Sequence, residues 1–121
     1  MYQIRIEDNF AAAHFLRDYH GKCEHLHGHN YKVRVYAQAK ELSPGGMVMD
    51  FGILKGYLKE VLKRYDHTLL NEQSPFDKLE PSAELIARTI YEELEKLMPG
   101  GGLSKVEVFE TEKNCAAYIP S

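Results

Sequence analysis

Apolar and polar residues alternate near both ends of this chain, and alternation with a period of two predicts β-strands. Residues 2–14 alternate loosely and are expected to form a strand that ends near His14. The alternation is cleaner over residues 29–39, where one face carries Tyr31, Val33, Val35, Ala37 and Ala39. Residues 103–111 alternate in the same way, and residues 115–120 are expected to form a short further strand.

Two stretches in the middle of the chain have apolar residues at helical spacing. The first has them at positions 53, 54, 57, 58, 61 and 62. The second spans residues 83–98, and its expected apolar face consists of Leu85, Ile86, Ile90, Leu94 and Leu97. Pro81 and Ser82 suit the beginning of this helix, and the Pro99 that follows suits its end. Residues 65–81 are expected to be an irregular connection.

The predicted order is strand, strand, helix, helix, strand, strand. This order favours an α+β fold in which two helices cover one face of an antiparallel sheet. We see no repeat or linker, and a length of 121 residues suits one domain spanning residues 1–121. A sheet of so few strands has open edges, and open edges pair with other chains. We therefore expect the protein to oligomerise.

The composition narrows the class of protein further. With 44% hydrophobic and 27% charged residues, the chain resembles ordinary globular proteins. Its net charge of −3 argues against a general nucleic-acid binder. No apolar run approaches the ~20 residues that span a bilayer, and the first residues do not resemble a signal peptide. Cys23 and Cys115 are therefore expected to be reduced thiols in a cytoplasmic protein, not a disulfide.

Histidines cluster between positions 14 and 29, which hold five of the six in the chain. His27 and His29 are two apart at the start of a strand, so both side chains point to one face. A hairpin between the first two strands would bring His14 beside His29. Three histidine ligands with a fourth position open are typical of catalytic zinc. We interpret His20 as a surface residue, whereas His25 is either solvent-exposed, a substrate contact or a competing ligand.

Cys23 lies in a loop beside Gly21 and Lys22, four residues before His27. A nearby metal and cationic groups would lower the pKa of its thiol and favour the reactive thiolate. The spacing leaves three roles open: an inert loop cysteine, a fourth metal ligand or a general base.

Two carboxylates also stand at positions suited to chemistry. Asp66 precedes His67, and a carboxylate can stabilise a charged imidazole for proton transfer, although a capping aspartate would give the same pattern. Glu110 shares a strand face with Val106 and Val108, where a carboxylate is costly unless it is paired. The alternative for Glu110 is a frayed strand end exposed to water.

Together, His14 and the segments "CEHLHGHNY", "MVMDF", "DHTLLN", "PSAELIA" and "VFETEKNCAAY" resemble the 6-pyruvoyltetrahydropterin synthase family. The resemblance is greatest to its 6-carboxytetrahydropterin synthase branch, which serves queuosine-type deazapurine synthesis. It covers nearly the whole chain and implies the tunnelling fold. It also implies a homo-hexamer made of two trimers, with active sites between subunits.

The resemblance implies roles for individual residues. The zinc ligands would be His14, His27 and His29, the catalytic cysteine Cys23, and the proton-relay pair Asp66 with His67. Glu110 would hold two parallel N–H groups of the pterin ring, a geometry that suits a carboxylate. Ser82 and Ala83 match the pterin pocket loosely, and the candidate triphosphate contacts are Arg17, Lys22, His25 and Lys32.

The substrate that the resemblance implies is 7,8-dihydroneopterin triphosphate. In the carboxy branch, triphosphate and acetaldehyde leave and a 6-carboxyl remains, whereas the pyruvoyl branch keeps the side chain intact. Three residues separate Cys23 from "HGH", a gap that resembles the carboxy enzymes. The alternatives are a 6-pyruvoyltetrahydropterin synthase, a related dihydroneopterin side-chain lyase, or a non-catalytic zinc-binding scaffold. The presence of Cys23, Asp66, His67 and Glu110 disfavours the scaffold.

Overall fold

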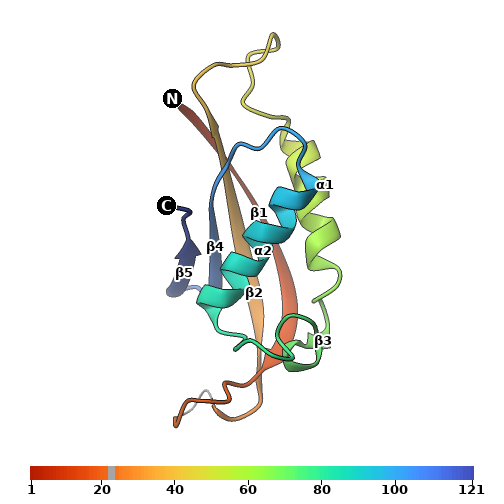
Figure 1. The fold of residues 1–121 in the computed structure, drawn as a ribbon, viewed down its shortest axis with the longest axis vertical. Helices are drawn as coiled ribbons and strands as arrows, with labels where there is room; N and C mark the ends of the chain where they lie inside the picture. The colour runs from red at the N-terminus through yellow and green to blue at the C-terminus, as the bar shows by residue number, and fades with distance from the viewer. Residues whose placement is uncertain (22–23) are drawn as a thin grey trace.

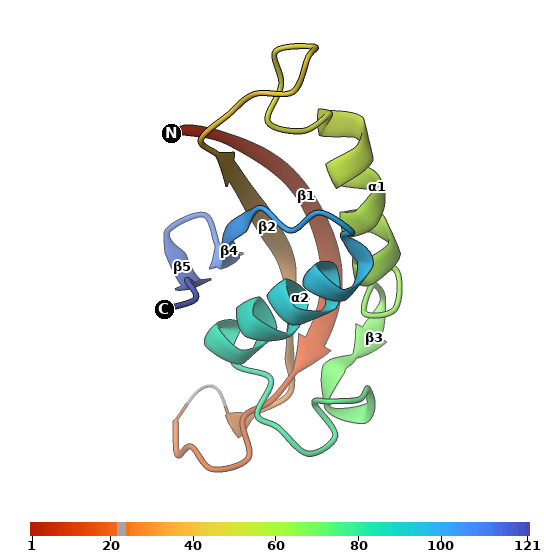
Figure 2. The ribbon, with the colours of Figure 1, turned by 45° about the horizontal axis from the view of Figure 1, so that its top comes forward.

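A computed structural model describes residues 1–21 and 24–121 of the chain. Its strands are β1 (Tyr2–His14), β2 (His27–Ala39), β3 (Thr68–Leu69), β4 (Leu103–Thr111) and β5 (Asn114–Tyr118). Its helices are α1 (Phe51–Leu62), α2 (Ala83–Leu97) and the short 3₁₀ helix η2 (Leu70–Glu72). The strands form one sheet in the order β3-β1-β2-β4-β5, and α1 and α2 lie on one face of it (Figures 1 and 2). The predicted α+β fold is confirmed.

The centre of the sheet is a long antiparallel hairpin. β1 and β2 pair along their whole length, from Tyr2 opposite Ala39 to His14 opposite His27. β4 pairs antiparallel with β2, and β5 with β4. β3 instead pairs parallel with β1 at Ala12 and Ala13. β3 lies within the segment expected to be an irregular connection, because two residues are too few to show an alternation.

The core lies between the sheet and the two helices. Val33 and Val108 are fully buried there, and the ring of Phe10 stacks on that of Tyr31 with centroids 4.8 Å apart. The buried helix residues include Leu54, Leu58, Ile86, Ile90 and Leu94. Two residues expected on the buried faces are exposed, Ile53 at 55% and Leu97 at 43%. Ile53 lies about 100° around the helix from the buried Leu54, whereas Leu97 is the last residue of α2, where less of the sheet covers the helix.

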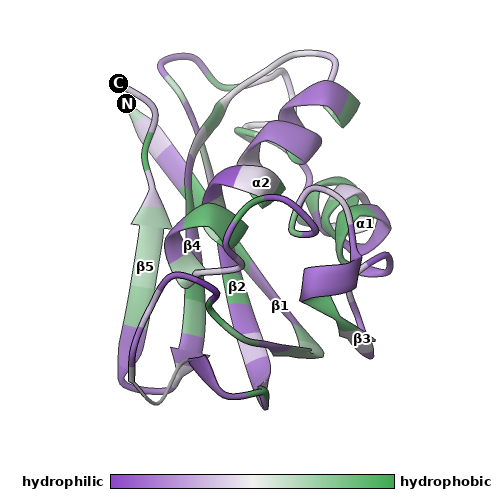
Figure 3. Cartoon of the chain, turned by 60° about the horizontal axis from the view of Figure 1, so that its bottom comes forward, coloured by the Kyte–Doolittle hydropathy of each residue, from purple (hydrophilic) through white to green (hydrophobic). Residues whose placement is uncertain are grey.

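The face of the sheet that lacks helices carries charged side chains. Glu7 of β1 pairs with Arg34 of β2 at 2.8 Å, and Lys32 of β2 pairs with Glu112 at 3.1 Å. Hydrophilic and hydrophobic positions therefore alternate along these strands (Figure 3). Across the described part of the chain, every helix is too short or too polar to span a membrane.

Candidate active site

Three histidines converge where the β1–β2 hairpin ends on the helix-facing side. The ring centroids of His14 are 4.5 Å from His27 and 5.1 Å from His29, and those of His27 and His29 are 4.8 Å apart. One ligand nitrogen from each ring lies within 4.8 Å of the others, so the three could hold a metal ion. His14 lies beside His29 as expected, although its partner in the strand pairing is His27 and His29 pairs with Ala12. β2 begins at His27, two residues before the start that the alternation indicated.

Backbone carbonyls set the tautomers of two of these rings. His14 Nδ1 lies 2.7 Å from the Pro81 carbonyl oxygen, and His27 Nδ1 lies 2.6 Å from that of His25. A carbonyl only accepts hydrogen bonds, so each Nδ1 donates and each Nε2 presents a lone pair. The two Nε2 atoms are 3.0 Å apart. Two facing lone pairs at that distance repel unless a cation lies beside both, so this geometry fits a metal centre.

Burial makes these rings suitable as neutral ligands. It lowers the pKa of His14 and of His29, since desolvation penalises the charged imidazolium. His29 Nε2 is buried without a hydrogen-bond partner among the described residues. Three imidazole nitrogens suit zinc, copper, iron or nickel. With only three protein ligands, such a centre would keep a position for substrate.

Glu110 stands beside this group instead of fraying into water. It lies on the helix-facing side of β4, and its Oε2 is 3.8 Å from His29 Nε2. The neighbours on that side, Val106 and Val108, are fully buried. A carboxylate with a side chain only 27% exposed is thus available next to the histidine group.

Asp66 and His67 form the predicted pair, and both are hydrogen-bonded to Ala11 of β1. Asp66 Oδ1 accepts a hydrogen bond from the Ala11 N–H at 2.9 Å and lies 3.0 Å from His67 Nδ1. The bond from Ala11 is the main reason why the pKa of Asp66 is lowered. His67 donates its own N–H to the Ala11 carbonyl at 2.6 Å and adopts a positive φ of 60°. These contacts hold a charged carboxylate against an imidazole that is 81% exposed.

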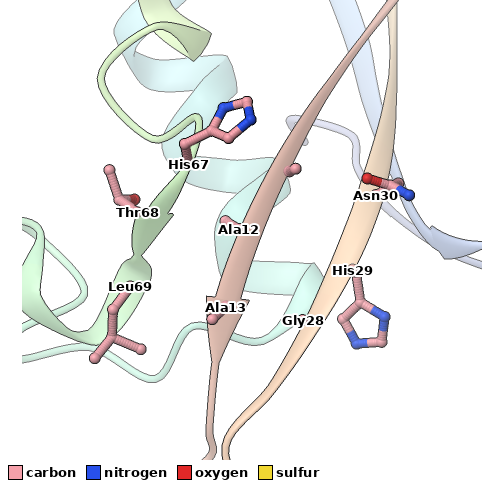
Figure 4. A pocket seen from close by; sticks show the side chains of 9 residues that line it. Ala12, Ala13, Gly28, His29, Asn30, His67, Thr68 and Leu69 are labelled. Atoms are coloured by element: carbon pink, nitrogen blue, oxygen red, sulfur yellow. The ribbon is translucent and has the colours of Figure 1, made fainter.

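His67 and the histidine group lie apart within the chain. β3 is on one side of β1 and β2 is on the other. Figure 4 shows His67 and His29 on opposite sides of β1 with their rings pointing in different directions. His67 and His29 both line a shallow pocket of about 560 Å³, which Ala13 and Gly28 also line. Ala13 and Gly28 alternate with the inward-facing His14 and His29, so these two small residues belong to the helix-free face of the sheet.

The remaining candidate residues are placed as follows. Ser82 caps α2, because its hydroxyl accepts from the Leu85 N–H at 3.2 Å, and Ala83 is the first residue of the helix. The side chain of His25 is 79% exposed and lies outside the histidine group. Lys22 and Cys23 lie outside the described residues.

Two candidate triphosphate contacts are engaged elsewhere. Arg17 donates to three backbone carbonyls, and Lys32 lies on the helix-free face, against Phe109 and Glu112. The Pro81 carbonyl, which orients His14, was not foreseen. No sequence signal marks it, since every residue has a carbonyl.

Comparisons with known proteins identify the family of this chain. The sequence model of the 6-pyruvoyl tetrahydropterin synthase family matches residues 3–121 of this chain. A 6-carboxy-5,6,7,8-tetrahydropterin synthase of Synechocystis is 41% identical over 98% of this chain and 94% of its own. The human 6-pyruvoyl tetrahydrobiopterin synthase is 37% identical over 96% of this chain and 90% of its own. The solved structure of the Caenorhabditis elegans 6-pyruvoyl tetrahydropterin synthase has a TM-score of 0.91 and 32% identity, covering 99% of this chain and 96% of that one.

Proposed function

Because this chain belongs to the 6-pyruvoyl tetrahydropterin synthase family, we propose that it is a zinc-dependent 6-carboxy-5,6,7,8-tetrahydropterin synthase. It converts 7,8-dihydroneopterin triphosphate to 6-carboxytetrahydropterin, acetaldehyde and triphosphate, a step toward queuosine-type deazapurines. One observation carries the proposal. The Nε2 atoms of His14 and His27 lie 3.0 Å apart with their lone pairs facing each other, and His29 lies beside them. The similarity to relatives named 6-carboxy-5,6,7,8-tetrahydropterin synthase supports the carboxy branch.

His14, His27 and His29 would hold the zinc through ring nitrogens. When bound, zinc supplies a Lewis acid that polarises the hydroxyl groups of the substrate side chain. The carbonyls of Pro81 and His25 keep two of the ligands in the required tautomer.

Proton transfer falls to the other residues. In this proposal Cys23, as a thiolate, removes a proton from the side-chain carbon next to the pterin ring. His67 moves the second proton, with Asp66 holding its ring. Because His67 and His29 lie on opposite sides of β1 within one chain, we infer that His67 acts at the site of a neighbouring copy. This supports a homo-oligomer with shared sites, such as the expected hexamer of two trimers.

Changing Glu110 to Gln is expected to weaken pterin binding by about 2–3 kcal/mol, roughly 30- to 150-fold. One carboxylate oxygen becomes an NH₂ group that would face an N–H of the ring. Titration of the zinc-loaded protein with 6-carboxypterin measures the effect, while its zinc content stays unchanged. Glu112→Gln is the matched control, since the Glu112 side chain is 87% exposed. Equal pterin affinity in wild type and Glu110→Gln would show that Glu110 does not hold the ring.

The test of the whole proposal is the identity of the products. Incubation with 7,8-dihydroneopterin triphosphate should release acetaldehyde, detected through alcohol dehydrogenase and NADH. Mass spectrometry should find a pterin with a 6-carboxyl group. The second candidate is 6-pyruvoyltetrahydropterin synthase, which the likeness to the human relative favours. An intact three-carbon side chain without acetaldehyde would assign the chain to that branch.

A further inference from the structure

The chain just after β1 is fastened to the chain just before α2 by side chains that the proposed chemistry does not use. Asn71 forms two hydrogen bonds with the backbone of Phe15, accepting from its N–H and donating to its carbonyl, each at 3.0 Å. Asn71 is only 7% exposed. A buried amide that pairs with both groups of one peptide residue fixes how the two segments lie against each other.

Arg17 provides the second part of this connection. Its Nη1 donates to the Leu79 carbonyl at 3.0 Å, and its Nη2 donates to those of Phe76 at 2.7 Å and Asn71 at 3.3 Å. Nη1 also lies 3.6 Å from Glu80 Oε1. Arginine suits such a cluster because its planar group presents five N–H donors in a fixed arrangement. Its donors therefore serve the protein backbone and are not directed to a phosphate.

Glu80 completes the connection from the other side. Its two carboxylate oxygens accept hydrogen bonds from the backbone N–H of Arg17, each at 3.0 Å. Oε2 also accepts one from the backbone N–H of Asp18 at 3.1 Å. We name the contacts of Asn71, Arg17 and Glu80 the Arg17 clamp. Through charged and amide groups, the clamp joins the backbone that follows β1 to the backbone that precedes α2.

The clamp lies next to the metal ligand His14 on both of its sides. Phe15 directly follows His14, and Glu80 directly precedes Pro81, whose carbonyl accepts from His14 Nδ1 at 2.7 Å. His14 is thus held between two segments whose relative position the clamp sets. A displacement of the Pro81 carbonyl would leave the His14 Nδ1–H without its acceptor and allow the ring to turn.

We propose that Arg17 is a positioning residue for the metal centre. It keeps the Pro81 carbonyl in reach of His14 and so directs the His14 Nε2 lone pair toward the ion. This inference rests on the proposed metal site, and it assigns Arg17 a task other than binding the substrate triphosphate.

The test compares the zinc affinity of the full-length protein with that of Arg17→Lys and Arg17→Met, by competition with a chromophoric chelator. Lysine keeps the charge but offers one flexible ammonium group in place of the planar group. Both variants are expected to raise the zinc dissociation constant about 10- to 100-fold, the usual effect of losing support behind a ligand. The matched control is Arg88→Met, because Arg88 forms an (i,i+4) pair with Glu92 on α2 at 3.7 Å. Its dissociation constant should equal that of wild type.

A second readout separates positioning from general stability. Saturating zinc should raise the melting temperature of wild type, since a ligand that binds only the folded state stabilises it. The increase should be smaller in the Arg17 variants, whereas a purely structural role would lower the melting temperature equally with and without zinc. A wild-type zinc affinity in both variants, or a change only in the KM for substrate, would overturn the inference. If wild type itself binds no zinc, the proposed function fails together with it.

Discussion

Replacing Cys23 with alanine is expected to lower turnover by about 10³-fold while leaving about one zinc bound per chain. Cys23 stands in the segment between the proposed ligands His14 and His27, where a metal and Lys22 would favour its thiolate. Alanine removes the proposed base but none of the three imidazoles. Acetaldehyde release measures turnover, and elemental analysis of the purified variant measures zinc.

Cys115→Ala is the control for this variant. Cys115 lies on β5, is exposed, and has no role in the proposed chemistry. It should keep both wild-type turnover and wild-type zinc content. Loss of zinc together with activity in Cys23→Ala would show that Cys23 is a fourth ligand. Full activity with full zinc would mean that Cys23 is an inert loop residue.

Co-assembly of Cys23→Ala chains with His67→Ala chains is expected to restore about a quarter of wild-type activity, although each variant alone is nearly inactive. The physical reason is the position of His67, which lies on the other side of β1 from His29 of its own chain. If each site takes Cys23 from one chain and His67 from another, random mixing leaves about one site in four with both residues.

Co-expression of the two variants with different affinity tags gives the mixed assemblies for this measurement. Two-step purification then isolates oligomers that contain both chains. A co-expressed double variant, Cys23→Ala with His67→Ala in both chains, is the control and should stay inactive. Mixed assemblies without recovered activity would show that both residues act within one chain. Chains that never co-purify would contradict the expected oligomer.

The order of the main elements was predictable because each depends on side chains close together in the sequence. The strand at residues 103–111 and the helix from Ala83 follow the predicted bounds closely, since alternation and a serine cap are local signals. The same holds for the placement of His27 and His29 on one face, which needs only the period of a strand. The faces were less accurate at Ile53 and Leu97, because how far a helix is covered depends on its neighbours.

The sequence by itself therefore determined the fold class, the family resemblance and the residues that could carry chemistry. Only the tertiary structure decided that His14 pairs with His27, that the Pro81 carbonyl orients His14, and that Arg17 serves the backbone. It also decided that His67 and His29 lie on opposite sides of β1. These facts depend on the register of the hairpin and on contacts between residues more than 50 positions apart in the chain, such as Arg17 and Phe76. Periodicity reports the environment of a side chain, whereas backbone carbonyls look alike in every sequence until the folded chain gives them partners.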